Sequence, residues 1–173
     1  MGTVTLITGG ARSGKSEHAL ALAHQAPGAR RFFIATAEAL DDEMHERIAH
    51  HRANRSTGFA TIEEPLAIGG ALSELASSAD IVVIDCLTLW ISNLLMAGRD
   101  DGAILSEARG LAGTMAEAPF ASIVVTDEVG AGIVPDNPTA RRFRDLLGWT
   151  NQAVAQAAER VVLMVAGYPL RVK

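Results

Sequence analysis

The chain has 173 residues, of which 49% are hydrophobic and 20% are charged, a composition typical of a folded globular protein and not of a disordered one. Its formal net charge is −5, which excludes the broad positive field that a nucleic-acid partner requires. No linker-like segment divides the sequence. We therefore expect residues 1–173 to form one catalytic domain with a sizeable core.

Cysteine usage and the absence of targeting signals indicate a compartment. Cys86 is the only cysteine, so no disulfide can form within the chain, as expected in a reducing environment. No basic, cleavable leader precedes the first strand pattern, and no run approaches the roughly 18 apolar residues of a membrane helix. We expect a cytoplasmic protein that does not insert into a membrane.

Hydrophobic periodicity and breaker residues predict an alternation of strands and helices. In chain order, the predicted elements are strand 3–8, helix 15–25, strand 31–36, helix 41–55, strand 60–63, helix 65–77, strand 81–85, helix 87–96, helix 103–116, strand 122–126, helix 139–159 and strand 161–166. This pattern predicts an α/β fold of the P-loop NTPase type (RecA-like), with a mostly parallel sheet and helices on both faces.

Polar motifs follow several of these strands. They are the glycine-rich segment 9–16, Thr36, Asp85 and the pair Asp127 and Glu128. Ligands of such sheets bind beyond the carboxyl ends of the parallel strands, so we expect these motifs to converge on one site.

The segment GGARSGKS, between the first strand and the first helix, has the pattern of a phosphate-binding loop. Its glycines allow a tight turn that directs backbone N–H groups at phosphate oxygens, and the helix that follows adds its positive dipole end. Lys15 is expected to reach the outer phosphates as a catalytic residue, and the Ser16 hydroxyl to ligate Mg²⁺. A chance match in a glycine-rich turn is disfavoured by the strand and helix on either side.

Asp85 ends an apolar strand, as does the acid that supports Mg²⁺ in P-loop enzymes. The same position suits an N-cap of helix 87–96, and the two roles are compatible. Trp90 and Trp149 lie on predicted helices with apolar neighbours, so we expect packing rather than a role as ligand platforms. The apolar helix 87–96 is also compatible with a subunit contact.

The predicted helix 41–55 carries an unusual basic face. Arg47, His51 and Arg55 are spaced i, i+4 and i+8 and so share one side of a helix. A neutral imidazole between two arginines suits attack on phosphorus near pH 7. A solvated basic face and a metal pair with His50 are the alternatives, although adjacent helical residues point about 100° apart. The residues alone do not decide between them.

Taken together, these segments resemble the bifunctional adenosylcobinamide kinase/adenosylcobinamide-phosphate guanylyltransferase family. The resemblance runs from Leu6 to the end of the chain. It rests on GGARSGKS, IATAEALDDEM, RIAHHRANR, EEPL, DCLTLWISNLL, TDEVGAGIVP and ARRFRDLLGWTNQAVA.

This resemblance implies two reactions in the synthesis of adenosylcobalamin. ATP or GTP phosphorylates adenosylcobinamide, and GTP then gives GMP to the resulting phosphate through a GMP–histidine intermediate, leaving adenosylcobinamide-GDP and pyrophosphate. The matching histidine is His51 rather than His50. The resemblance also implies a homotrimer.

The resemblance further implies a set of nucleotide contacts. They are Gly9, Gly10, Ala11, Arg12, Ser13, Gly14, Lys15, Ser16, Ala35, Thr36, Ala37, Arg52, Ala53, Asn54, Arg55, Glu63 and Asp85. Family members vary between Asp and Glu at the position of Asp85, so its partner is either Mg²⁺ or the guanosine hydroxyls. For Asp127 and Glu128, a base for the substrate hydroxyl, an indirect ligand of Mg²⁺ and a loop cap all stay open.

Two other functions are compatible with the phosphate-binding loop. A monofunctional small-molecule kinase of the same fold needs the loop but not His51, and a non-catalytic nucleotide-binding regulator needs neither a nucleophile nor a second substrate.

Overall fold

The computed structural model describes residues 2–38 and 58–173. Its elements in chain order are β1 (Val4–Gly9), α1 (Lys15–Gln25), β2 (Arg31–Ala35), β3 (Phe59–Glu63), α3 (Ile68–Glu74), β4 (Ile81–Asp85), α4 (Leu87–Met96), α5 (Asp101–Glu117), β5 (Ala121–Val125), α6 (Pro138–Ala157), β6 (Arg160–Val165) and β7 (Tyr168–Arg171). The predicted helix over 41–55 lies outside these residues.

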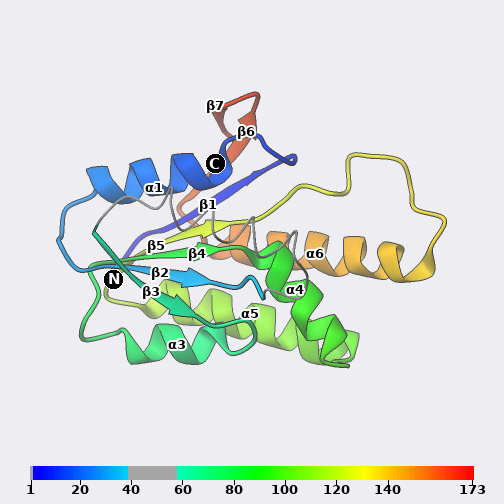
Figure 1. Ribbon diagram of the computed structural model, residues 1–173, viewed down its shortest axis with the longest axis horizontal. Coiled ribbons are helices and arrows are strands. Elements are labelled where there is room, and N and C mark those ends of the chain that lie inside the picture. The colour runs from blue at the N-terminus through cyan, green and yellow to red at the C-terminus, as the bar shows by residue number, and fades with distance from the viewer. Residues whose placement is uncertain (1, 39–57) are drawn as a thin grey trace.

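The described strands form one seven-stranded sheet in the order β3-β2-β4-β5-β1-β6-β7 (Figure 1). Every neighbouring pair is parallel except β6 and β7, which are antiparallel. The parallel α/β architecture predicted from the sequence is confirmed. The phosphate-loop strand β1 lies between β5 and β6, and β4 and then β2 follow on the far side of β5.

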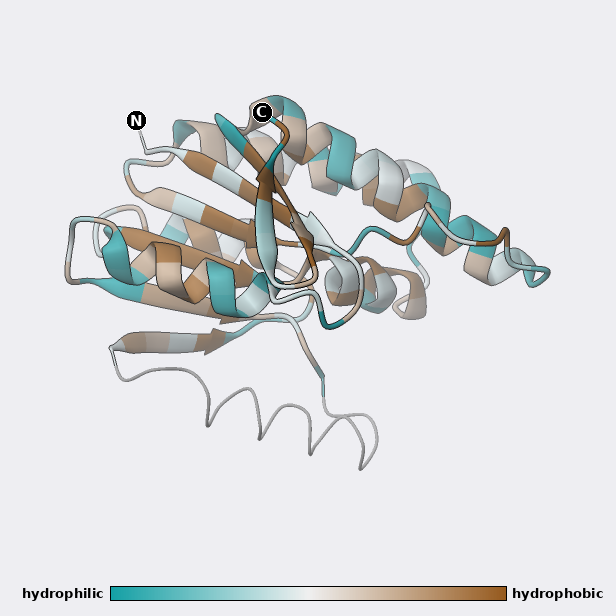
Figure 2. Ribbon diagram, turned by 90° about the horizontal axis from the view of Figure 1, so that it is seen from above, coloured by the Kyte–Doolittle hydropathy of each residue, from teal (hydrophilic) through white to brown (hydrophobic). Residues whose placement is uncertain are grey.

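Helices cover both faces of the sheet, as predicted, but unequally. In Figure 1 α1 lies on one side, whereas α3, α4, α5 and α6 lie on the other. The sheet has a hydrophobic core on each face, and successive residues of a strand point into opposite cores. Val82 and Ile84 belong to the larger core, whereas Ile81 and Val83 belong to the core under α1. Figure 2 shows the apolar residues concentrated along the strands.

Local capping explains where two helices differ from their predicted starts. The Asp100 carboxylate accepts a hydrogen bond from Ala103 N at 2.8 Å, so α5 begins two residues before the predicted position 103. Glu64 Oε1 accepts hydrogen bonds from Leu66 N and Ala67 N. Those bonds form a turn over the residues where the sequence suggested a first helical turn, and α3 begins only at Ile68.

The sequence analysis did not predict β7. Its connection to β6 is a two-residue turn of Ala166 and Gly167, with φ values of 50° and 86°, which is the left-handed turn that suits a tight hairpin. Pro169 lies within the strand and disfavours a strand by sequence. It is tolerated because β7 is the edge of the sheet, where one side of the strand needs no ladder donors.

The two tryptophans differ in environment. Trp90 is 1% exposed and its indole N–H donates to Leu66 O at 2.7 Å, as expected for a core residue. Trp149 is 51% exposed, so it packs much less completely than Trp90. Helix α4 places Leu87, Ile91 and other apolar side chains in the core, while Met96 at its end is 60% exposed. Among the described helices, none has the length and apolarity that crossing a membrane requires.

Candidate nucleotide-binding site

The phosphate loop connects β1 to α1 and needs glycine at two positions. Gly9 has φ 153°, and a Cβ there would lie 2.6 Å from Met164 O and 2.8 Å from Ser13 Oγ. Gly14 has φ 91°, in the left-handed region, and directly precedes Lys15, the first residue of α1. The sequence therefore produces the compact strand–loop–helix turn that was predicted for residues 9–16.

The C-terminal hairpin lies against this loop. Gly167 N donates a hydrogen bond to Ser13 O at 3.1 Å, and a Cβ on Gly14 would be 3.4 Å from Gly167 Cα. Ser13 is 9% exposed, and its hydroxyl has no hydrogen-bond partner among the described residues. Buried hydroxyls are usually hydrogen-bonded, so this group is suited to donate to a phosphate oxygen.

Lys15 lies inside the loop and is 8% exposed. Its ammonium donates to Gly10 O at 2.6 Å and lies 2.6 Å from Asp127 Oδ1. An ammonium has three N–H donors, so two contacts leave one for a phosphate oxygen. The catalytic lysine predicted from the sequence is thus held between its own loop and the end of β5.

The residues after β5 are fastened to three neighbouring elements. Asp127 N donates to Thr88 Oγ1 of α4 at 2.8 Å, and Asp127 O accepts a hydrogen bond from Asn151 Nδ2 of α6 at 3.1 Å. Glu128 N donates to Gly9 O at 3.0 Å. These bonds fix the backbone that carries the Asp127 carboxylate relative to Lys15.

Thr36, which follows β2, is fully buried and its side chain is already engaged. Its hydroxyl donates to Cys86 O at 2.7 Å and accepts from Cys86 N at 2.8 Å, which fixes the end of β2 to the end of β4. Asn93 Nδ2 donates to Thr36 O at 2.8 Å and to Pro65 O at 3.1 Å. Thr36 therefore shapes the segment 35–37 rather than presenting a free hydroxyl.

Two predicted acidic contacts flank Ala35 at the same edge of the sheet. Ala35 pairs with Glu63 on β3 and with Asp85 on β4, so the three residues are in register. Asp85 also pairs with Val125 of β5, the strand beside β1. Glu63, Asp85 and the loop therefore share the carboxyl edge, as the sequence predicted.

Cys86 directly follows Asp85, but its thiol is unreactive. Burial raises the pKa of its thiol to about 12, and the negative charges of Asp85 and Asp127 add to that effect. Since the thiolate is the reactive form, Cys86 does not act as a nucleophile near neutral pH.

The predicted nucleophile His51 and the contacts Arg52, Ala53, Asn54 and Arg55 lie outside the described residues. Their roles stay predictions. The sequence analysis missed Thr88, Asn93, Asn151 and Gly167, which position the site from helices and from the hairpin. The one available signal was Asn93, a lone amide in the apolar segment LTLWISNLL.

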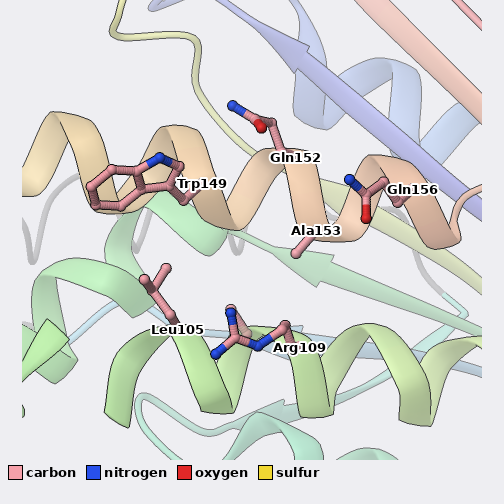
Figure 3. Close-up of a pocket in the computed structure, with 7 residues that line it drawn as sticks. Leu105, Arg109, Trp149, Gln152, Ala153 and Gln156 are labelled. Carbon is pink, nitrogen blue, oxygen red and sulfur yellow. The ribbon is translucent and has the colours of Figure 1, made fainter. Parts of the chain in front are cut away.

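A groove of about 350 Å³ lies between α5 and α6. Figure 3 shows that Trp149 and its neighbours on α6 face Leu105 and Arg109 on α5. The lining residues are Leu105, Ala108, Arg109, Trp149, Gln152, Ala153 and Gln156, none of which belongs to the predicted nucleotide site.

Comparison with known proteins adds the family. The model of the family described as "Cobinamide kinase / cobinamide phosphate guanyltransferase" matches residues 5–172. The chain belongs to this family. Membership in the cobinamide kinase/guanyltransferase family confirms the prediction of an enzyme with kinase and nucleotidyltransferase activities in adenosylcobalamin biosynthesis.

Relatives in the cobinamide kinase/guanyltransferase family match over nearly their whole length. The bifunctional adenosylcobalamin biosynthesis protein CobP of Pseudomonas aeruginosa is 44% identical over 168 residues, covering 97% of this chain and 96% of the relative. The CobU proteins of Salmonella typhimurium and Escherichia coli are 39% and 38% identical, and in each case the match covers 97% of this chain and 98% of the relative.

A structural comparison supports the fold independently of this cobinamide kinase/guanyltransferase match. The crystal structure of the RadB recombinase superposes with a TM-score of 0.56 at 13% identity, covering 93% of this chain and 73% of RadB. At that identity the likeness concerns the fold alone. It confirms the predicted RecA-like P-loop architecture.

Proposed function

We propose that this chain phosphorylates adenosylcobinamide with ATP or GTP and then transfers GMP from GTP to the resulting phosphate at the same nucleotide site. This proposal rests on the family match over residues 5–172 and on a phosphate loop whose Lys15 is held at the carboxyl edge of the sheet. The single seven-stranded sheet supports one catalytic domain over residues 1–173.

In the kinase step, the substrate hydroxyl oxygen bonds to the γ-phosphorus while the bond from that phosphorus to the β,γ-bridging oxygen breaks. The nucleoside diphosphate leaves, and the hydroxyl proton passes to solvent. Lys15, the backbone N–H groups of 9–16 and the start of α1 stabilise the phosphate charge, which is the main catalytic requirement of this chemistry.

In the guanylyltransferase step, a ring nitrogen of His51 attacks the α-phosphorus of GTP and pyrophosphate leaves. A phosphate oxygen of the substrate then attacks the same phosphorus and releases His51. Splitting the displacement avoids direct attack of one bulky anion on another. His51 lies in the sequence between β2 and β3, and β2 ends beside Asp85 at the carboxyl edge of the sheet.

We assign the nucleotide contacts predicted from the sequence to this site: Gly9 to Ser16, Ala35, Thr36, Ala37, Arg52, Ala53, Asn54, Arg55, Glu63 and Asp85. The register of Glu63, Ala35 and Asp85 at one edge supports the described part of this set. Arg52 and Arg55 supply positive charge for phosphates.

The oxygen donors of Ser16 and Asp85 fit Mg²⁺, which prefers hard ligands and keeps most of its waters. The described residues contain no group of three or more His, Cys, Asp or Glu side chains placed to bind a metal. When bound, Mg²⁺ would neutralise charge on the phosphates.

The proposed setting is a cytoplasmic homotrimer. The single cysteine supports a reducing compartment. Exposed apolar side chains support association: Ile133 is 97% exposed in the connection between β5 and α6, and Tyr168 of β7 is 79% exposed. Light scattering coupled to gel filtration tests the trimer.

The two-step function is tested with GTP radiolabelled at the α-phosphate. The wild type is expected to acquire an acid-labile label, lose it to phosphorylated adenosylcobinamide and release pyrophosphate. His51→Ala is expected to lose the label but keep kinase activity, with His50→Ala as the matched control. Kinase activity without labelled protein in the wild type would instead support the monofunctional kinase. GTP binding without turnover of either kind would support a nucleotide-binding regulator.

A further inference from the structure

The Lys15–Asp127 pair brings together two residues whose roles the sequence analysis treated separately. Lys15 Nζ lies 2.6 Å from Asp127 Oδ1 and donates to Gly10 O at the same distance. The side chains are only 9% and 27% exposed, so solvent screens this pair less than a surface ion pair.

We propose that Asp127 is a positioning residue for Lys15 in the kinase reaction, and that its carboxylate competes with the triphosphate for the Lys15 ammonium. The proposal rests on the proposed function for its kinase part. Asp127 holds the ammonium against Gly10 O with one N–H left for the transferred phosphate. The negative charge of Asp127 weakens nucleotide binding, but the same carboxylate holds the lysine in place.

Hydrogen bonds fix the backbone of Asp127, as a positioning role requires. Its N–H and C=O groups are bound by Thr88 and Asn151, which come from α4 and α6. The neighbouring acid Glu128 is directed elsewhere, since its Oε1 accepts a hydrogen bond from Gly130 N at 2.8 Å. Asp127 is thus the acid of this pair that faces the phosphate loop.

Removing the charge of Asp127 should move affinity and turnover in opposite directions. Asp127→Asn keeps the size of the side chain but removes the carboxylate that competes with the triphosphate for the Lys15 ammonium. GTP should therefore bind more tightly. The same change frees the lysine to adopt several positions, so phosphoryl transfer should slow. A residue that only supports the fold would instead weaken binding and lower the melting temperature.

The experiment measures GTP binding by titration calorimetry and the kinase kcat with adenosylcobinamide, in wild type and Asp127→Asn. We expect the Kd for GTP to fall about threefold to tenfold and kcat to fall at least about tenfold, the size expected for one charge contact. Asp136→Asn, an exposed acid in the next loop, is the control and should change neither. An unchanged or higher Kd, or an unchanged kcat, would overturn the proposal.

A spectroscopic test includes one measurement on the wild type, the hydrogen exchange of Lys15, that does not depend on that variant folding. Lys15 and Lys173 are the only lysines in the sequence, so a protein labelled with ¹⁵N at lysine Nζ gives two signals. The Lys15 signal should show slowed hydrogen exchange before GTP is added and should shift in Asp127→Ala or Asp127→Asn, while Lys173 stays in place. A Lys15 signal that exchanges like a free lysine would overturn the proposal. Because GTP binding and these spectra need no corrinoid, failure of the proposed substrate would be seen separately.

Discussion

Asn93 on α4 allows a direct test of how the site is held. Its side chain is 5% exposed and its amide donates to Thr36 O and to Pro65 O, at the ends of β2 and β3 respectively. Asn93→Leu keeps the branched shape and the number of side-chain heavy atoms and suits the apolar helix, but it removes both donors. The variant therefore tests mainly the two hydrogen bonds.

The expected loss follows from the two carbonyl groups left behind. A buried acceptor without a partner costs about 1–3 kcal/mol, and the added apolar contact of leucine offsets about 1 kcal/mol. Thr36 is fully buried but Pro65 is only half-buried, so its carbonyl loses less, and we expect the free energy of unfolding to fall by about 2 kcal/mol. With a urea dependence of about 2 kcal/mol per molar, the unfolding midpoint should fall by about 1 M.

Urea unfolding followed by circular dichroism measures this shift, with Gln152→Ala as the control because Gln152 is an exposed amide on α6. GTP affinity should also weaken, since Thr36 shapes a predicted contact segment. A midpoint within about 0.3 M of the control would refute the reasoning, because it would mean that the carbonyls of Thr36 and Pro65 find other partners at little cost.

Two further predictions concern glycine geometry and pH. Gly9→Ala should lower the melting temperature by about 6 °C, since its Cβ would lie 2.6 Å from a carbonyl oxygen, whereas Gly10→Ala, with no atom within 4 Å, should leave the temperature nearly unchanged; calorimetry that found equal effects would contradict this. Hydrogen bonds from Arg30 lower the pKa of Asp80 from 3.8 to about 2, so the stability that Asp80 adds over Asp80→Asn should be complete above about pH 4 and lost as the pH falls through about 2. Urea unfolding at several pH values checks this, and a difference that grew toward low pH would contradict it.

The sequence was most informative where local rules act alone. The apolar runs at 81–85 and 87–96 match β4 and α4 to the residue, because both runs are strongly apolar and Ala97-Gly98 follows the second; Ile81 to Ile84 are buried, as are Leu87, Trp90, Ile91 and Leu94 of α4. The phosphate loop was equally clear, since its glycines are required by the backbone shape that Gly9 and Gly14 adopt. Alternation of strand and helix was sufficient for the parallel sheet.

Contacts between segments that are distant in the sequence could not be predicted from local patterns. The pairing of Lys15 with Asp127 depends on β5 lying beside β1, a neighbour relation that no local pattern encodes. Asn93 was visible as a polar residue in an apolar helix, but its two carbonyl partners are set by tertiary packing. Strand β7 was missed because Pro169 disfavours a strand unless the edge position is known.

The hydrogen bond between Gly167 and Ser13 joins residues near opposite ends of the chain. Strand β1 also lies between β5 and β6, both of which follow it by more than 100 residues, so β1 is enclosed only after those later strands have been made. The phosphate loop therefore acquires its full support only once the β6–β7 hairpin has folded against it. Nascent chains stalled before the hairpin should not be retained on immobilised GTP, whereas chains stalled after it should be.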